Sequence, residues 1–117
     1  MSIVRHGVTR RYADSVVHGG TAYLVEVPPD LDVGIAEQTA GLLASAERLL
    51  AQAGSDRSHL LMVTIYLADM ADYAAMNAIW DDWLPVGCAP ARACVEARLA
   101  DPRMRVEMAF TAALAQG

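Results

Sequence analysis

The chain has 117 residues, of which 55% are hydrophobic and 20% are charged, so it is long enough for one domain with one buried core, spanning residues 1–117. Its 14 acidic and 9 basic residues give a net charge of -5, which would repel a phosphate backbone and argues against nucleic acid as a partner. Every basic residue is an arginine, which excludes lysine-based covalent catalysis through a Schiff base.

Two β-rich runs near the N-terminus flank the pair Gly19-Gly20, an arrangement that is typical of a hairpin. The predicted strands cover residues 14–18 and 21–27. The pair Pro28-Pro29 ends the second strand because proline cannot donate to a strand ladder. Residues 3–5 allow a further short strand before the hairpin.

A helix is predicted over residues 33–53, with Asp32 as its N-cap and Gly54 as its C-terminal stop. Apolar side chains recur along it at helical spacing, at Ile35, Leu42, Leu43, Ala46, Leu49 and Leu50. One face of this helix must therefore be covered.

Residues 59–68 form a nearly continuous apolar run, which predicts a central strand covered on both faces. Asp69 followed by Asp72 resembles a capping box that opens a second helix over residues 70–84. The apolar stripe of that helix consists of Tyr73, Met76, Trp80 and Leu84.

The last two predicted strands cover residues 91–99 and 104–114, with a turn at Asp101-Pro102 between them. Side chains alternate between the two faces of a strand. In the first strand this alternation opposes Ala91, Ala93, Val95, Ala97 and Leu99 to Arg92, Cys94, Glu96 and Arg98. In the second it opposes Met104, Val106, Met108 and Phe110 to Arg103, Arg105, Glu107, Ala109 and Thr111. We expect the apolar side of each strand to face the helices.

The resulting order is β-β-α-β-α-β-β, and the fold class is α+β, with two helices packed on one face of a mixed sheet. No apolar run is long enough for a signal peptide or a membrane span, which predicts a cytoplasmic protein without a membrane partner. Cys88 and Cys94 lack the spacing of a zinc site, and the three histidines are scattered. We therefore expect free thiols and neither a metal nor a cofactor.

Four segments, RYADSVVHGGTAYLVEVP, DYAAMNAIWDDWL, PARACVEARL and RVEMAFTAAL, resemble the RidA/YjgF family of reactive-intermediate deaminases, also called L-PSP endoribonuclease-like. The IVR start and the segments AEQT and LADMADYAAMN are similar to its short YoaB-like branch. The resemblance covers essentially the whole chain. It implies a chorismate-mutase-like fold and a homotrimer whose sheets form an inner barrel, with ligand sites in the clefts between subunits. Such a ring would also cover the second face of the sheet.

In this family the arginine of the P-x-R-x-C block holds the substrate carboxylate, and the matching residue here is Arg92. A guanidinium suits that role because its planar fork of donors fits a carboxylate. Taken without the resemblance, Arg92 would be expected to pair with an acid such as Glu96 or Glu107 across a subunit boundary. The resemblance also implies that the backbone carbonyl of Cys94 positions water, whereas the thiol itself is expected to be a small buried hydrophobe.

Two further residues align with family positions near the ligand. Tyr12 matches a tyrosine that closes over the ligand, and Asn77 matches an asparagine on the second helix. Their alternative roles are structural, with Tyr12 anchoring the N-terminal segment on the sheet and Asn77 capping local backbone.

Two polar groups of the deaminating branch are absent from this sequence. Val25 stands in place of a serine, and Ala109 stands in place of the second glutamate of an E-x-E pair. Glu107 and Glu26 are then the candidate replacement bases, although Glu107 lies about 7 Å along the strand from position 109.

The resemblance implies hydrolysis of 2-imino acids and their enamine tautomers to 2-oxo acids and ammonia. Such imines already hydrolyse in water. Orientation of the carboxylate and the water can therefore suffice for activity, even without a general base, which typically increases the rate by about 10²–10⁴-fold. The alternative is a non-catalytic or regulatory trimer that binds small carboxylates, which the absent serine and glutamate favour. The ribonuclease activity in the family's other name conflicts with the acidic charge.

Overall fold

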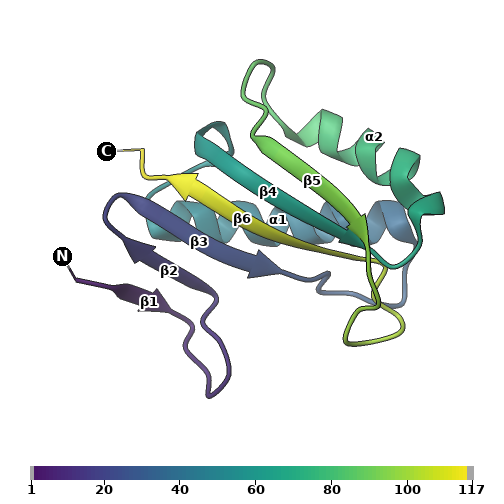
Figure 1. The fold of residues 1–117 in the computed structure, drawn as a ribbon, viewed down its shortest axis with the longest axis horizontal. Helices are drawn as coiled ribbons and strands as arrows, with labels where there is room; N and C mark the ends of the chain where they lie inside the picture. The colour runs from purple at the N-terminus through teal and green to yellow at the C-terminus, as the bar shows by residue number, and fades with distance from the viewer. Residues whose placement is uncertain (1, 116–117) are drawn as a thin grey trace.

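One mixed β-sheet of six strands organises the protein, whose computed structural model describes residues 2–115. The strands are β1 (Val4–His6), β2 (Ser15–His18), β3 (Thr21–Glu26), β4 (Leu60–Leu67), β5 (Ala91–Glu96) and β6 (Val106–Ala113). Their spatial order is β1-β2-β3-β6-β4-β5 (Figure 1). Neighbouring strands are antiparallel except β4 and β5, which are parallel and therefore need a crossover between them.

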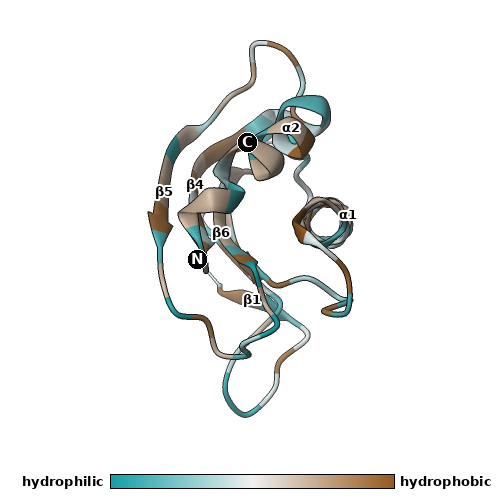
Figure 2. Ribbon diagram, turned by 90° about the vertical axis from the view of Figure 1, so that its right-hand side faces the viewer, coloured by the Kyte–Doolittle hydropathy of each residue, from teal (hydrophilic) through white to brown (hydrophobic). Residues whose placement is uncertain are grey.

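Both α-helices, α1 (Ile35–Ala53) and α2 (Tyr73–Trp83), cover the same face of the sheet (Figure 2). Helix α2 is the crossover between β4 and β5. Two short 3₁₀ turns, η1 (Arg57–His59) and η2 (Met70–Asp72), precede β4 and α2. The predicted α+β class, the element order and the additional first strand are confirmed. No helix within residues 2–115 combines the length and apolar character that a membrane span requires.

Helix α1 begins two residues later than predicted, and Asp32 is not its N-cap. Gly34 takes that position, and the Glu37 carboxylate accepts a hydrogen bond from the Gly34 backbone N–H at 3.1 Å. Asp32 instead pairs with Arg103 at 3.4 Å. The C-terminal stop is confirmed, since Gly54 adopts the left-handed conformation at φ 90° that favours glycine.

The second helix also begins differently from the prediction. Asp69 caps the 3₁₀ turn η2 by accepting a hydrogen bond from the Ala71 N–H at 2.9 Å. Asp72 takes no part in a capping box, because its carboxylate binds Arg105 through two contacts of 2.8 and 3.0 Å. The α-helix proper therefore starts only at Tyr73.

The hydrophobic core lies between the sheet and the two helices. It contains Leu24, Leu42, Leu43, Ala46, Leu50, Leu60, Val63, Ile65, Leu67, Met76, Trp80, Val106, Met108, Phe110 and Ala112. The side of β6 predicted to meet the helices is correct, since Val106, Met108 and Phe110 are buried there. The apolar stripe of α1 is also confirmed, with Leu42, Leu43, Ala46 and Leu50 fully buried and Ile35 and Leu49 packed against the core.

No helix of residues 2–115 covers the second face of the sheet (Figure 2). Strand β4 was predicted to be covered on both faces, but only its helix side is buried, and Leu61 and Met62 are 50% and 41% exposed. Tyr23, Val25 and Val95 are exposed as well. We call this surface the open face. Its apolar character explains why β4 resembles a fully buried strand in the sequence.

Candidate functional site

Arg92 lies on the face of β5 that the helices cover, so the predicted orientation of this strand is wrong. In the parallel ladder Arg92 pairs with Val63 and Cys94 with Ile65, and both β4 residues are fully buried beneath the helices. Residues paired across neighbouring strands point to the same face. The apolar Val95, expected inside, is 43% exposed on the open face. The reason is that β5 is an edge strand that α2 covers only partly, so polar side chains on its helix side still reach solvent.

Helix α2 holds the Arg92 side chain through three residues at positions i, i+4 and i+7, which lie on one stripe of a helix. The Asn77 Oδ1 accepts a hydrogen bond from Arg92 Nη1 at 2.9 Å, and the Tyr73 hydroxyl accepts one from Nη2 at 3.2 Å. The guanidinium carbon also lies 5.4 Å from the centre of the Trp80 ring and 5.9 Å from that of Tyr73. These distances are within the range of cation–π attraction.

A cleft of about 350 Å³ opens beside this guanidinium, lined by Asn77, Trp80, Asp81, Ala89, Pro90 and Arg92. Arg92 makes no ion pair with any carboxylate among residues 2–115. An arginine carries five N–H donors, and Asn77 and Tyr73 use one each. The cleft therefore presents a preoriented cation with free donors, which suits a carboxylate.

Cys94 lies two residues further along β5 on the same face, packed against the core. Burial raises the pKa of its thiol, and the nearby positive charge of Arg92 opposes this only in part. A thiol with a raised pKa is a weak nucleophile at neutral pH because little thiolate is present. The side chain therefore favours a packing role, and any contribution of Cys94 to chemistry falls to its backbone.

Tyr12 lies in a different cleft, of about 540 Å³, near the end of β3. A turn places it there, because the Tyr12 carbonyl accepts a hydrogen bond from the Thr9 N–H at 2.7 Å. The ring is exposed, and Glu26 lies in the same cleft. Strands β6 and β4 separate β3 from β5, so three interstrand spacings, about 14 Å, lie between this cleft and Arg92 of the same chain.

Glu107 lies on the open face, opposite Tyr66 of β4. A cleft of about 320 Å³ there is lined by Glu107, Ala109, Val25 and Tyr66, together with residues 97–100. Arg92 and Glu107 thus lie on opposite faces of the sheet. One chain brings together Arg92 and Asn77 among the predicted site residues, but not Tyr12 or Glu107.

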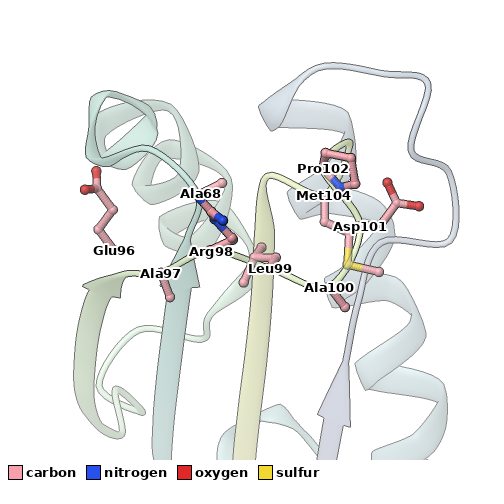
Figure 3. Close-up of a pocket in the computed structure, with 9 residues that line it drawn as sticks. All are labelled: Ala68, Glu96, Ala97, Arg98, Leu99, Ala100, Asp101, Pro102 and Met104. Carbon is pink, nitrogen blue, oxygen red and sulfur yellow. The ribbon is translucent and has the colours of Figure 1, made fainter.

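A larger cleft, of about 710 Å³, lies where β5 ends (Figure 3). Glu96 lies at one end of it and Asp101 at the other. Both carboxylates already have partners, since Glu96 accepts a hydrogen bond from the Met70 N–H at 2.8 Å and Asp101 pairs with Arg103 at 3.1 Å. Arg98 also lines this cleft, but no side chain among residues 2–115 holds its guanidinium as Asn77 and Tyr73 hold that of Arg92. The size of the cleft alone therefore does not make it the better candidate.

Tyr73 and Trp80 also contribute to the site, although their spacing predicts only that both belong to the apolar stripe of the helix. Trp80 is buried, but Tyr73 is 41% exposed and bonds Arg92. The spacing of these two residues around Asn77 was the available signal. Within residues 2–115 no group of three or more His, Cys, Asp or Glu side chains could hold a metal ion.

Comparison with known proteins places the chain in a family. The sequence profile of the Endoribonuclease L-PSP family matches residues 4–114. The RutC family protein YoaB of Escherichia coli K12 is 44% identical over 114 residues, covering 97% of this chain and 100% of YoaB. A RutC family protein of Haemophilus ducreyi is 42% identical over 113 residues, covering 96% of this chain and 97% of that protein.

The fold agrees with this sequence similarity. The crystal structure of a YjgF family member from Neisseria meningitidis superposes with a TM-score of 0.96 at 48% identity, covering 100% of this chain and 98% of the other. A crystal structure from Pseudomonas aeruginosa superposes with a TM-score of 0.94 at 46% identity, covering 97% of this chain and 99% of the other. The chain therefore belongs to the Endoribonuclease L-PSP family of RidA/YjgF proteins and, within it, to the YoaB-like branch.

Proposed function

We propose that the protein hydrolyses 2-imino acids and their enamine tautomers to 2-oxo acids and ammonia, with Arg92 binding the substrate carboxylate. One observation carries this proposal. The Arg92 guanidinium has no carboxylate partner among residues 2–115 and is held by Asn77 and Tyr73 with free donors beside a cleft. Such preorganisation favours binding because the side chain has little freedom left to lose.

The proposed reaction needs only a modest rate acceleration from the protein. An imine already reacts with water, so holding the carboxylate and a water molecule in register supplies most of the acceleration. Cys94 follows Arg92 by two residues on the same face of β5, and its backbone carbonyl is the proposed acceptor that orients the water. The raised pKa of the thiol is consistent with leaving the sulfur out of the reaction.

We further propose a homotrimer with its sites between subunits. The open face carries exposed Tyr23, Val25, Met62 and Val95, and a soluble monomer rarely leaves such an apolar surface uncovered. Because three interstrand spacings, about 14 Å, separate β5, which carries Arg92, from β3 beside the Tyr12 cleft, Arg92 and Tyr12 can share a ligand only if they come from different copies. A closed ring of identical chains satisfies both requirements.

The test couples a serine or threonine dehydratase, which releases the imine, to detection of the 2-oxo acid. Wild-type protein should accelerate the appearance of the oxo acid, and Arg92→Ala should lose most of that acceleration. Arg5→Ala, which changes an exposed arginine at the opposite edge of the sheet, is the matched control and should behave as wild type. Absence of any Arg92-dependent acceleration with every imine tried would refute the activity.

A second candidate function is binding of small carboxylates without turnover. It is favoured by the apolar pair Val25 and Ala109, which replaces two polar groups of the deaminating relatives and lines the Glu107 cleft. Calorimetry with a 2-oxo acid distinguishes the two functions. Arg92-dependent binding together with no turnover of the corresponding imine would establish the binder and exclude the enzyme.

A further inference from the structure

Glu26 is a half-buried carboxylate in the wall of the Tyr12 cleft. It is the last residue of β3, and the residues before and after it in the chain, Val25 and Val27, line the same cleft, as does Met104. Most of the lining is therefore apolar. The Glu26 side chain makes no hydrogen bond or ion pair with another side chain among residues 2–115, so it is free to exchange a proton with a ligand or with water.

Two charged groups from other elements act on Glu26. Asp14 comes from the segment between β1 and β2, and Arg48 comes from α1. Burial raises the pKa of Glu26, the negative charge of Asp14 raises it further, and the positive charge of Arg48 lowers it. Arg48 does not neutralise the carboxylate, because its guanidinium donates to the Ala44 carbonyl and to the Ser45 hydroxyl of its own helix. A carboxyl shifted in this way toward neutrality is typical of proton-transfer groups.

We propose that Glu26 is the proton-transfer residue of this deaminase and acts on a substrate whose carboxylate is held by Arg92 of a neighbouring copy. The inference rests on the proposed function and adds the group that replaces the missing glutamate. Within one chain β6 and β4 separate the two residues, so the complete site needs both copies. Tyr12, in the same cleft as Glu26, then closes the apolar side of the ligand.

The reaction begins with Glu26 as a base. The carboxylate takes a proton from water while the water oxygen forms a bond to the imine carbon, and the C=N π electrons move to the nitrogen. The nitrogen then takes the proton back from Glu26, which gives a carbinolamine. Glu26 next takes the proton of the carbinolamine hydroxyl and passes it to the nitrogen. The C–N bond then breaks as the C=O bond forms, which releases ammonia and leaves the 2-oxo acid. Glu26 ends in its starting state, so no oxidant or co-reactant is needed.

The first experiment measures kcat and KM for Glu26→Gln across pH. We expect kcat to fall by about 10²-fold while KM changes by less than about threefold, because general acid–base catalysis contributes about 10²–10⁴-fold. Asp14→Asn should move the acid limb of the wild-type pH profile to lower pH, since a negative charge that raises the pKa of Glu26 is removed. Glu47→Gln, an exposed acid on α1, is the control and should match wild type.

The outcomes separate this inference from the proposed function. If wild type turns over an imine and Arg92→Ala does not, but Glu26→Gln keeps the wild-type kcat and pH profile, only the role of Glu26 is overturned. If wild type shows no turnover, the proposed function falls and the inference falls with it. Circular dichroism and thermal unfolding of Glu26→Gln exclude misfolding, and an unfolding temperature at or above wild type is expected, because the amide removes a half-buried charge.

The second experiment mixes two inactive variants in one oligomer. Arg92→Ala and Glu26→Gln chains are unfolded together, refolded and checked by native mass spectrometry for mixed trimers. In a randomly mixed ring about a quarter of the boundaries join an intact Arg92 to an intact Glu26, so about a quarter of wild-type activity should return. Mixed trimers with no recovered activity would overturn the arrangement across subunits.

Discussion

Val25 and Ala109 lie directly opposite each other on the neighbouring antiparallel strands β3 and β6. They are the two positions at which the resemblance to the RidA/YjgF family implies a serine and a glutamate. Both line the open-face cleft that also contains Glu107. The two positions where the resemblance implies polar groups are therefore neighbours, and here they form an apolar patch beside the Glu107 carboxylate.

This pairing predicts that a carboxylate can be restored at the same spot. Ala109→Glu, alone or with Val25→Ser, should raise the rate of hydrolysis of 2-aminoacrylate by about ten- to a hundredfold, toward the contribution of a positioned base. The half-buried position leaves room for the carboxylate to reach the cleft. The coupled dehydratase assay measures the rate. Thr111→Glu, at the next open-face position of β6, is the control, and equal rates for the two variants would contradict the prediction.

The stripe on α2 predicts how Arg92 is prepared for its ligand. Asn77→Ala removes the 2.9 Å hydrogen bond and should raise KM, or the dissociation constant of a 2-oxo acid, by roughly tenfold, because a hydrogen bond to a charged group is worth about 1.5–3 kcal/mol. Tyr73→Phe keeps the ring near the guanidinium and should have a smaller effect, below about threefold. Calorimetric titration measures both variants. Unchanged affinity for Asn77→Ala would show that Arg92 is oriented by other groups.

Much of the fold could be predicted from periodicity, but the orientation of β5 could not. On β6 the apolar side is buried, as its alternation predicts. On β5 the same alternation is present and the opposite side faces the helices. The difference is position in the sheet, since β6 is an inner strand and β5 is an edge strand. On an edge strand, Arg92 can lie beside α2 and still reach solvent. Val95, on the open face, is not covered by any part of the chain among residues 2–115.

The candidate site could be predicted only in part, for a related reason. The resemblance identified Arg92 and Asn77, which the structure brings to 2.9 Å. It also identified Tyr12 and Glu107, which lie beside neither of them. A single sequence does not record which residues of different copies meet. Helix starts were misplaced because Asp32 and Asp72, both plausible caps, form ion pairs with distant arginines instead.

The ion pair between Asp72 and Arg105 joins the start of α2 to the entry of β6. Asp72 is 7% exposed, and both guanidinium contacts are 3.0 Å or shorter. Arg105→Ala leaves this carboxylate without its partner and should lower the free energy of unfolding by about 1–2 kcal/mol, a value reduced because Arg105 itself is partly exposed. Urea denaturation measures it. Arg103→Ala, which removes only exposed pairs, should cost less than Arg105→Ala, and a larger loss for Arg103→Ala would contradict this ranking.

Gln38 fixes the loop that precedes β6 to helix α1. Its buried side-chain amide donates to the carbonyls of Leu31, Val33 and Arg103, and its oxygen accepts from the Arg105 N–H at 2.8 Å. Gln38→Leu keeps the side-chain volume but leaves these backbone groups without hydrogen-bond partners. It should lower the free energy of unfolding by about 2–4 kcal/mol. Gln52→Leu, at an exposed position of the same helix, should stay within about 0.5 kcal/mol of wild type. Equal stability of the two variants would show that water replaces Gln38.

The turn η1 predicts a pH dependence centred on Asp56. Its carboxylate accepts hydrogen bonds from the Ser58 hydroxyl, His59 Nδ1 and the Ser58 N–H, and these lower the pKa of Asp56 from 3.8 to about 2. A carboxyl whose pKa is lower in the folded state stabilises the fold above its unfolded pKa, and this stabilisation is lost as the pH falls through the folded value.

Asp56→Ala should therefore be less stable than wild type at pH 7, by about 0.5–1 kcal/mol as for other lost caps, and the difference should shrink between pH 3.8 and about 2. Carboxyl chemical shifts give the direct measurement, with a midpoint near 2 for Asp56 in the folded protein. Ser58→Ala removes the main cause and should move that midpoint upward. A midpoint for wild-type Asp56 at the ordinary value of 3.8 would mean that these hydrogen bonds do not persist in solution.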